Sequence, residues 1–585
     1  MKKRVFALLL TLTMLLGLAI PAYADNADST DNITAMTMTE WADGAYPAVT
    51  ELQIATVSDF KIFMDVLQNQ SEPALNSVCQ LKPGVESIIA FEGVTIYLTA
   101  DLDLNPGWES TMDASWDHLE NDDDFMQDSL DDVADSIADL PEYTIQVHKG
   151  ATADQKGFGG MFDGMGHTIV GLCIVSSNTA TAQSLLGVVH SETDFVVGVK
   201  NLSLKNSYIE GTNHGLASLI GGVTAGTDAL IENCYVDVDL HSTSTAAAKS
   251  NCSAGGLVGQ VAGNLTIKNS VYAGDIFGGI LGRDDHRHVG AVAGLVVGAA
   301  SPDDEPATLT VENFAFTGNI NWENSQRVSS LVGRVENYAN VSFKNILALG
   351  GVLSNYGGLC RNVAGVKEGT TTTFSIENCL YHPNVSQTEV YETTPEGGTR
   401  FVGFRMDEKT RKTGYVQLIV NKALQSSIQK LPNVGYAFEA AALGSVEANL
   451  KNIVIVDNKD YQGTAAEAGL SQNGISGFQA VEEGYPLPSA LVAVFGTGVA
   501  GKSDITNPEE PNDEPATEPS EEPSEAPTTK PTTKPSTKPT QAPAAEDNGT
   551  EPQDLTGVII AIVAVVVVAG VVTAVVIIAK KKGKK

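Results

Sequence analysis

One asparagine recurs along the middle of this chain at a nearly constant spacing, and this recurrence restricts the fold more than any other feature. Successive copies are 32, 36, 44, 32 and 33 residues apart. The copies are Asn201, Asn233, Asn269, Asn313, Asn345 and Asn378. The clearest repeat is Gly255–Ile276, in which a Gly-rich apolar segment and a turn precede the segment that holds Asn269. A fixed period of this length is the signature of a solenoid, in which each repeat forms one coil of a stack.

The residues before each asparagine predict how the coils stack. The residue two positions earlier is apolar in all six copies, and the residue immediately before the asparagine alternates in charge. The charged series is Lys200, Glu232, Lys268, Glu312, Lys344 and Glu377. In a parallel β-helix, equivalent positions of successive coils lie about 4.8 Å apart, so this order places opposite charges side by side. The asparagines would then form a ladder of stacked amides. The alternative is that Lys and Glu simply occupy a solvent-exposed face.

Two groups of segments carry a resemblance to known proteins. The phrase TIYLTADLDL at residues 95–104 followed by FGGMFDGMGHTIVGL at residues 158–172 looks like the opening coils of bacterial surface proteins with a right-handed β-helix. The later GGLVG at Gly255–Gly259, followed by TIKNSVYAG, resembles the GLUG motif of bacterial adhesins and of the accessory regions of secreted immunoglobulin-A peptidases. Copies such as Leu185–Val188 lack the first glycine. The resemblance covers about residues 50–385 and implies an all-β, right-handed parallel β-helix. It implies little about activity, because the motif marks a stacking unit and not a site.

The two ends of the chain predict export and anchoring. Residues 1–24 combine a basic start, an apolar run and a small-residue cleavage site, which is typical of a signal peptide. Residues 557–579 are an uncharged apolar run long enough to span a bilayer as a transmembrane helix, and the basic tail at residues 580–585 is expected to stay in the cytoplasm. Residues 503–556 hold a proline at every fourth position over much of their length and predict an extended, disordered spacer. Attachment to the cell wall by a transpeptidase is the alternative, although Asp554–Gly557 lacks the proline of the LPxTG signal. We therefore expect a single-pass protein of a Gram-positive cell membrane with an extracellular ectodomain.

The ectodomain divides into three predicted parts. Residues 25–156 are expected to form an N-terminal cap and the first coils, interrupted by an acidic insert. Residues 157–385 hold the repeats, and residues 386–502, where the Asn and Gly rhythm ends, predict a C-terminal cap or a small α+β domain. A short helix near the start is expected to be capped by Ser58. Its apolar face would consist of Phe60, Phe63, Met64 and Leu67.

The net charge of −35 is concentrated outside the repeats. Asp101–His148 contributes −15 and residues 504–554 contribute −10. The repeats are therefore not strongly acidic, and the overall charge excludes nonspecific binding to nucleic acid.

Six cysteines show no spacing typical of a metal site. They are Cys79, Cys173, Cys234, Cys252, Cys360 and Cys379. An even number in an extracellular protein permits disulfides, and burial as small apolar side chains is the alternative.

No set of residues typical of catalysis or of cofactor binding occurs in the repeats, and we expect neither an enzyme nor a cofactor. The densest polar cluster is expected to be a surface loop, although it could bind a metal or a sugar acid. Its potential ligands are Asp284, Asp285, His286 and His288. His167 follows Asp163-Gly-Met-Gly and superficially resembles a residue of pectin-cleaving β-helix enzymes, but we interpret it as a turn residue.

These features together predict a membrane-anchored adhesin or binding protein that displays a β-helix to a host or cell-surface protein or glycan. Two alternatives stay open, a polysaccharide lyase or glycoside hydrolase on a β-helix, and a structural component of the envelope. A groove that gathers two or more carboxylates would favour the hydrolase.

Overall fold

The computed structural model describes most of the region between residues 33 and 507 and omits several internal segments. The described residues are 33–44, 46–68, 88–109, 140–146, 155–175, 182–211, 215–242, 253–279, 288–299, 301, 303–323, 328–336, 338–353, 359–364, 372–382, 402–405, 415–420, 446–501, 505 and 507. The described residues belong to one compact unit, which ends at Pro511.

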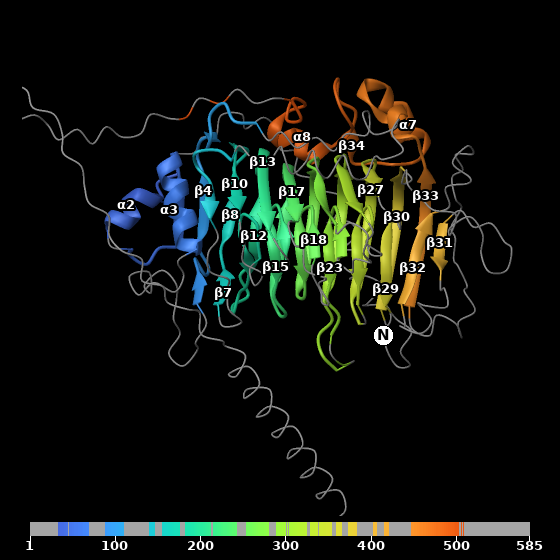
Figure 1. The fold of residues 1–585 in the computed structure, drawn as a ribbon, viewed down its shortest axis with the longest axis horizontal. Coiled ribbons are helices and arrows are strands. Elements are labelled where there is room, and N and C mark those ends of the chain that lie inside the picture. Colours follow the sequence, from blue (N-terminus) through green and yellow to red (C-terminus); the bar gives the residue numbers. More distant parts are fainter. Residues whose placement is uncertain are drawn as a thin grey trace, which may run out of the picture. The chain divides into compact units, whose positions relative to one another are not determined.

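Stacked parallel strands form a β-solenoid (Figure 1). The largest sheet has 20 strands: β1 (Met36–Thr37), β2 (Glu51–Ile54), β4 (Thr95–Leu98), β5 (Leu102–Asp103), β6 (Ile145–Gln146), β8 (Met161–Asp163), β9 (Thr168–Val170), β10 (Cys173–Val175), β12 (Val197–Lys200), β13 (Ser203–Gly211), β16 (Asp228–Glu232), β17 (Tyr235–Ser242), β20 (Asn264–Tyr272), β21 (Ile276–Gly279), β24 (Thr308–Phe316), β25 (Asn319–Glu323), β27 (Asn340–Ala348), β28 (Gly351–Leu353), β30 (Thr372–Tyr381) and β33 (Val446–Ile455). The second sheet has ten: β3 (Ile88–Ala90), β7 (Gln155–Phe158), β11 (Val188–Val189), β15 (Ile220–Val223), β19 (Val258–Val261), β23 (Ala293–Val296), β26 (Val332–Val335), β29 (Cys360–Ala364), β32 (Tyr415–Val420) and β31 (Val402–Arg405). The third has three: β14 (Leu216–Ala217), β18 (Ser253–Gly255) and β22 (His288–Gly290). Among the described strands of these three sheets, the antiparallel pairings are β29 with β32 and β31 with β32.

One coil follows β18, β19, β20 and β21 in turn before the chain enters the next coil at β22. Asn269 lies inside β20 with a φ of 49°, and this left-handed conformation turns the strand from one face of the coil to the next. Asparagine adopts such a φ more readily than other residues with a Cβ, because its short side chain can form local hydrogen bonds. The recurring asparagine is therefore the corner residue of each coil.

The interior of the solenoid is filled by rows of apolar side chains in register. The residue two positions before each corner asparagine is inside, as the repeat pattern predicts, and is at most 1% exposed. The row runs Val199, Ile231, Ile267, Val311, Phe343 and Ile376. Because neighbouring coils contribute the same kind of side chain at the same height, the core repeats along the stack.

Two helices lie before and after β2 in the sequence. α2 (Met38–Asp43) begins at the capping box of Thr37 and Glu40. α3 (Val57–Gln68) begins at Thr56, whose Oγ1 accepts the amide N–H of Asp59. The prediction of Ser58 as the cap is therefore wrong: the helix starts earlier, where Asp59 and Thr56 bond each other's backbone.

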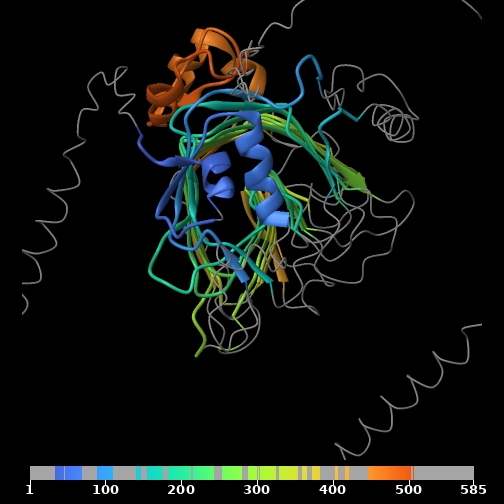
Figure 2. The same cartoon turned by 90° about the vertical axis from the view of Figure 1, so that its left-hand side faces the viewer.

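The predicted apolar face of α3 contacts the interior of the first coils. The ring of Phe63 lies 5.7 Å from that of Phe91, 6.2 Å from that of Phe158 and 5.5 Å from that of Phe162. Figure 2 shows the two helices in front of the coils at this end. Aromatic side chains at this separation and tilt form a compact cluster.

The described strands of the stack include one beyond residue 385. β33 pairs in parallel register with β30 from Val446 to Ile455, so it adds another coil level. Residues 446–455, which fall in the region predicted as a cap or a small α+β domain, therefore belong to the stack.

The residues after β33 return along the side of the solenoid. They comprise η5 (Asn458–Tyr461), η6 (Gly463–Ala465), α7 (Ala466–Gln472), β34 (Phe478–Gln479), β35 (Leu487–Pro488) and α8 (Ser489–Phe495). We call residues 457–501 together with Asn507 the strap. In Figure 1 the strap lies along the ends of the strands from β33 towards β13, and Figure 2 places it outside the coils.

The strap buries a row of apolar side chains on the outer face of the solenoid. Each member lies two positions after a corner asparagine. The row is Tyr235, Val271, Ala315, Leu347, Leu380 and Val454, and its members are in register. Leu470, Phe478, Leu487 and Leu491 of the strap belong to the same apolar cluster. Covering this row removes apolar surface from water, which stabilises the fold by about 25 cal/mol for each Å² buried.

No helix among the described residues is long and apolar enough to cross a membrane. The predicted signal peptide at residues 1–24, residues 110–139 of the acidic insert, the spacer beyond Asn507 and the apolar run at residues 557–579 lie outside the described residues.

Candidate functional site

The structure brings the predicted asparagines together at one corner of the stack. The side-chain Nδ2 of each donates to Oδ1 of the preceding one over 2.9 to 3.2 Å. All six have φ between 49° and 59°. Each amide therefore both donates to one neighbour and accepts from the other, apart from those at the ends.

The asparagine ladder is longer than the sequence period suggests. At one end Asn201 Nδ2 donates to Asp163 Oδ1 over 3.0 Å. At the other end Asn452 Nδ2 donates to Asn378 Oδ1 over 2.9 Å, and Asn452 has a φ of 53°. Asn452 escaped the repeat pattern because it follows Asn378 by 74 residues.

The alternating charges lie in register beside the asparagines. Asp163 pairs with Lys200 at one end of the series and Glu377 with Lys451 at the other, so the alternation covers eight consecutive levels. Ion pairs join Lys200 to Asp163 at 3.1 Å, Lys344 to Glu312 at 3.2 Å, and Lys451 to Glu377. The Lys344 and Glu312 side chains are 53% and 36% exposed, so each such pair stabilises the fold by only about 0.2–1 kcal/mol.

The glycines of the GLUG-like segment allow backbone to approach backbone. A Cβ on Gly255 would lie 1.8 Å from the carbonyl oxygen of Val258, and one on Gly256 would lie 2.3 Å from that of Ala291. A Cβ on Gly259 would lie 2.3 Å from Cα of Gly215. Without a side chain, these glycines allow the sharp turn between β18 and β19 and the close approach of neighbouring coils, as expected for tight packing. They form no phosphate-binding loop.

His288, one of the predicted metal ligands, is buried within the stack. It lies in β22 with no exposed surface, and its Nε2 is 3.4 Å from Nη1 of Arg334. A guanidinium at this distance disfavours a bound cation. Asp284, Asp285 and His286 lie outside the described residues, and the residues that the structure describes contain no cluster of three metal-ligating side chains.

His167 follows a turn at Met165 and Gly166, both with positive φ. Its Nδ1 is 3.2 Å from Oδ1 of Asp101. The hydrogen bond from His167 is the main cause that lowers the pKa of Asp101, and the Thr168 amide adds to it while burial opposes both.

The four described cysteines, Cys173, Cys234, Cys360 and Cys379, are buried and unbridged. Burial raises the pKa of Cys173 to about 11 and that of Cys234 to about 12, so these thiols are protonated at neutral pH. Cys79 and Cys252 lie outside the described residues.

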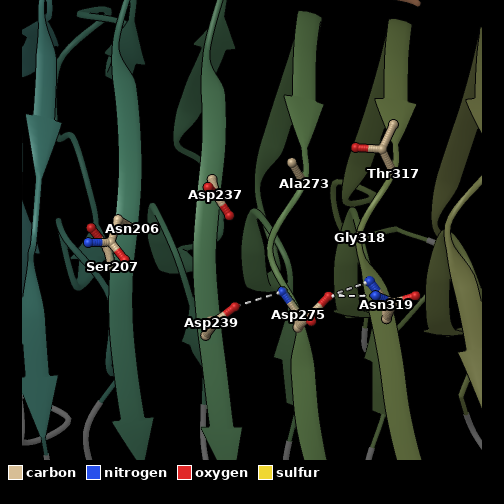
Figure 3. Close-up of a pocket in the computed structure, with 9 residues that line it drawn as sticks. All are labelled: Asn206, Ser207, Asp237, Asp239, Ala273, Asp275, Thr317, Gly318 and Asn319. Carbon is tan, nitrogen blue, oxygen red and sulfur yellow. Dashed lines mark hydrogen bonds between the residues drawn. The ribbon is translucent and has the colours of Figure 1, made fainter. Parts of the chain in front are cut away.

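A polar pocket that the sequence did not indicate lies on the outer face of the solenoid (Figure 3). It has a volume of about 320 Å³. Its lining consists of Asn206, Ser207, Asp237, Asp239, Ala273, Asp275, Thr317, Gly318 and Asn319. The aspartates alternate along β17 with the buried Val236, Val238 and Leu240, so they face outwards.

Three residues of the pocket form a second ladder across neighbouring coils. Asp239 Oδ1 accepts the backbone N–H of Asp275 over 3.1 Å. Asp275 Oδ1 accepts both the backbone N–H of Asn319 at 2.7 Å and its side-chain Nδ2 at 3.0 Å. These bonds fix the two carboxylates one coil apart, and Figure 3 shows them side by side with Asn319.

Asp237 and Lys205 lie at the side of the pocket next to the strap. Burial is the main cause that raises the pKa of Asp237, while the charge of Lys205 and the Asn206 amide act against it. Burial lowers the pKa of Lys205, and Asp237 opposes this effect. The Lys205 ammonium donates to the carbonyl oxygen of Gly501 in the strap.

A cluster of Tyr208, Glu210 and His241 adjoins the pocket. Tyr208 is in register with Asp239, and Glu210 with His241. The Tyr208 hydroxyl donates to Glu210 Oε2 at 2.8 Å and lies 3.1 Å from His241 Nδ1. Burial raises the pKa of Glu210, but hydrogen bonds from His241 and Tyr208 outweigh it and lower the net value. Glu210 is therefore ionised at neutral pH.

No family model matches this chain, and neither do the curated proteins or the solved structures. The fold and the pocket therefore define the protein at the level of architecture, as a parallel β-solenoid with a polar pocket on its outer face.

Proposed function

We propose that this chain is a cell-surface binding protein whose solenoid presents the pocket around Asp239 and Asp275 to a glycan. The observation that carries the proposal is the pair of carboxylates held one coil apart beside Asn319. Ionised carboxylates accept hydrogen bonds, and amides both donate and accept them. Sugar hydroxyl groups need this combination, and a neutral or amine-bearing sugar suits an acidic pocket better than an anionic one.

The geometry of the pocket supports a repeating ligand. Successive coils place Asp239, Asp275 and Asn319 in one row at a spacing of about 4.8 Å per coil. A sugar unit is of similar length, so neighbouring units of one chain would meet neighbouring coils.

The location and architecture belong to the same proposal. A signal peptide would export the chain, and the apolar run at residues 557–579 would anchor it in the membrane behind the proline-rich spacer. α2 and α3 would serve as the N-terminal cap of a right-handed solenoid of the GLUG type, since parallel connections are nearly always right-handed. A protein partner or a structural role in the envelope would leave the pocket without a use.

The test is a glycan array probed with the ectodomain, residues 25–511, which contains every residue that the structure describes. We expect binding to one class of neutral or amine-bearing glycan, and its loss in Asp239→Asn and Asp275→Asn. Asp194→Asn, which changes an exposed carboxylate away from the pocket, is the matched control. Binding that survives both pocket substitutions would place the ligand elsewhere.

Glycoside hydrolysis is the second candidate, and a specific observation favours it. The pocket gathers Asp237, Asp239 and Asp275, and burial raises the pKa of Asp237. Hydrolases pair a protonated carboxyl that donates a proton with an ionised one on the other side of the bond. Release of reducing ends from a bound polysaccharide, abolished by Asp237→Asn and retained in Asp194→Asn, would support hydrolysis. Binding without any release would support the binding protein.

A further inference from the structure

The strap runs along the solenoid in the direction opposite to the order of the coils. Near its start, Asn458 Nδ2 donates to the carbonyl oxygen of Leu349 over 3.1 Å. Its Asn473 carbonyl accepts the side chain of Asn452, the last member of the asparagine ladder, at 3.0 Å. Its far end reaches the first coils, where Asn507 and Asp103 exchange two hydrogen bonds of 2.7 Å each. The chain that continues from Asn507 therefore departs beside the first coils, although β33 is the last.

The strap is attached without joining the sheets of the solenoid. Its two strands, β34 and β35, pair with each other in a two-stranded sheet of their own. Its contacts to the coils are the apolar cluster around Leu487 and Leu491 and a few hydrogen bonds. Detaching the strap would therefore break no strand pairing in the three sheets of the solenoid.

Polar contacts hold the end of the strap that leads to the rest of the chain. The bonds of Asn507 to Asp103 and of Lys205 to the Gly501 carbonyl are polar and few. The buried apolar residues of the strap, from Tyr461 to Val499, all precede these two contacts in the chain. Tension applied beyond Asn507 meets the polar contacts first and the apolar ones afterwards.

From this arrangement we propose that mechanical force reversibly detaches the strap from the solenoid. Tension on the chain beyond Asn507 detaches the strap from the first coils towards the last and lengthens the connection while the solenoid stays folded. When the tension falls, the strap binds again to the outer apolar row. This device goes beyond ligand binding and does not depend on the pocket, so a chain that binds no glycan would still show it.

The released length follows from the sequence. The sequence from Asp457 to Asn507 contains 51 residues, and an extended chain spans about 3.4 Å per residue, so release adds roughly 170 Å of contour length. The solenoid is covalently joined to the strap only at its last coil, so the coils remain paired after release.

The test is single-molecule stretching of the full ectodomain between handles at its N-terminus and after residue 556. We expect a first, reversible step at low force whose gain in contour length is roughly 170 Å, before any larger step from the coils. Asn507→Ala removes both bonds to Asp103 and should lower the force of this first step, with spontaneous opening about tenfold faster. Gln472→Ala removes an exposed amide from α7 as the matched control and should leave the first step unchanged.

Two results would overturn the proposal. One is a single step in which the strap and the coils unfold together. The other is a first step whose force is the same in Asn507→Ala and in the unmodified chain.

Discussion

Asn452 donates its side-chain N–H to Oδ1 of Asn378 over 2.9 Å, although 74 residues separate them in the sequence. The same bond joins each earlier pair of corner asparagines at separations of 32 to 44 residues. The corner asparagines therefore stay in register with one another although the length of chain between them varies.

Substitution of one corner asparagine tests this relationship. Asn269→Ala loses the bonds to Asn233 and Asn313 and forces alanine into a φ of 49°. We expect a loss of about 2–4 kcal/mol in the free energy of unfolding. Asn269→Gly loses the same bonds without the strain and should cost about 1 kcal/mol less. Urea unfolding of the ectodomain measures both, and equal losses would show that the left-handed corner carries no strain.

The charge ladder predicts the effect of a reversal. Lys268→Glu places three carboxylates at successive levels with Glu232 and Glu312. We expect a loss of about 0.2–1 kcal/mol for each of the two unfavourable pairs. The control, Lys268→Gln, removes the charge and should cost less. Because these side chains face solvent, raising the salt concentration should bring the two variants together. If they are equally destabilised at low salt, stacking of charges does not stabilise the fold.

The GLUG-like glycines predict a steric effect. Gly256→Ala would place a Cβ 2.3 Å from the Ala291 carbonyl and 2.6 Å from the Tyr272 ring. We expect a loss of about 1–3 kcal/mol or more in thermal or urea unfolding. Gly498→Ala is the matched control, because nothing lies within 4 Å of its Cβ position. It should stay within about 0.5 kcal/mol of the unmodified chain.

Asp237 predicts a dependence of stability on pH. Burial raises its pKa in the folded chain above 3.8, so the folded state holds this proton more tightly than the unfolded state. The stability that the protonated form contributes is full below the unfolded pKa and is lost as the pH rises through the folded value. Relative to Asp237→Asn, the unmodified chain should therefore become less stable as the pH rises from about 3.5 towards 7. Urea unfolding of both chains across this range measures the difference, and an unmodified chain that gains stability relative to Asp237→Asn as the pH rises would contradict the raised pKa.

The corners could be predicted from sequence because each one repeats three independent signals. An apolar residue, a charge of alternating sign and an asparagine occur together, as at Ile267, Lys268 and Asn269. A parallel solenoid accounts for all three signals at once. The register could therefore be predicted from the repeat up to Asn378. Asn452 was missed because the long insertion before it breaks the period.

The strap could also have been inferred. Three consecutive apolar or small residues follow several corners, as in Phe314-Ala315-Phe316, and such a strand is apolar on both faces. A strand of this kind requires cover on its outer side as well. What the sequence does not specify is which segment supplies the cover, because the strap contacts coils far from it in sequence.

The sequence contains a weaker signal for the pocket. A polar residue occurs six positions after three successive corners, at Asp239, Asp275 and Asn319. Read singly, each is an ordinary surface residue, and only the register of β17, β21 and β25 brings them into one row.

The contacts of the strap fit only one number of coils. Its contacts are assigned to particular levels: Asn473 to Asn452, Gly477 against Asn313, and Asn507 to Asp103. One coil more or fewer would shift every later contact by about 4.8 Å, and the far end would miss Asp103. Repeat proteins commonly gain and lose units because each unit contacts only its neighbours. In this chain a segment synthesised after all the coils spans them, so a copy with the wrong number would be unable to close.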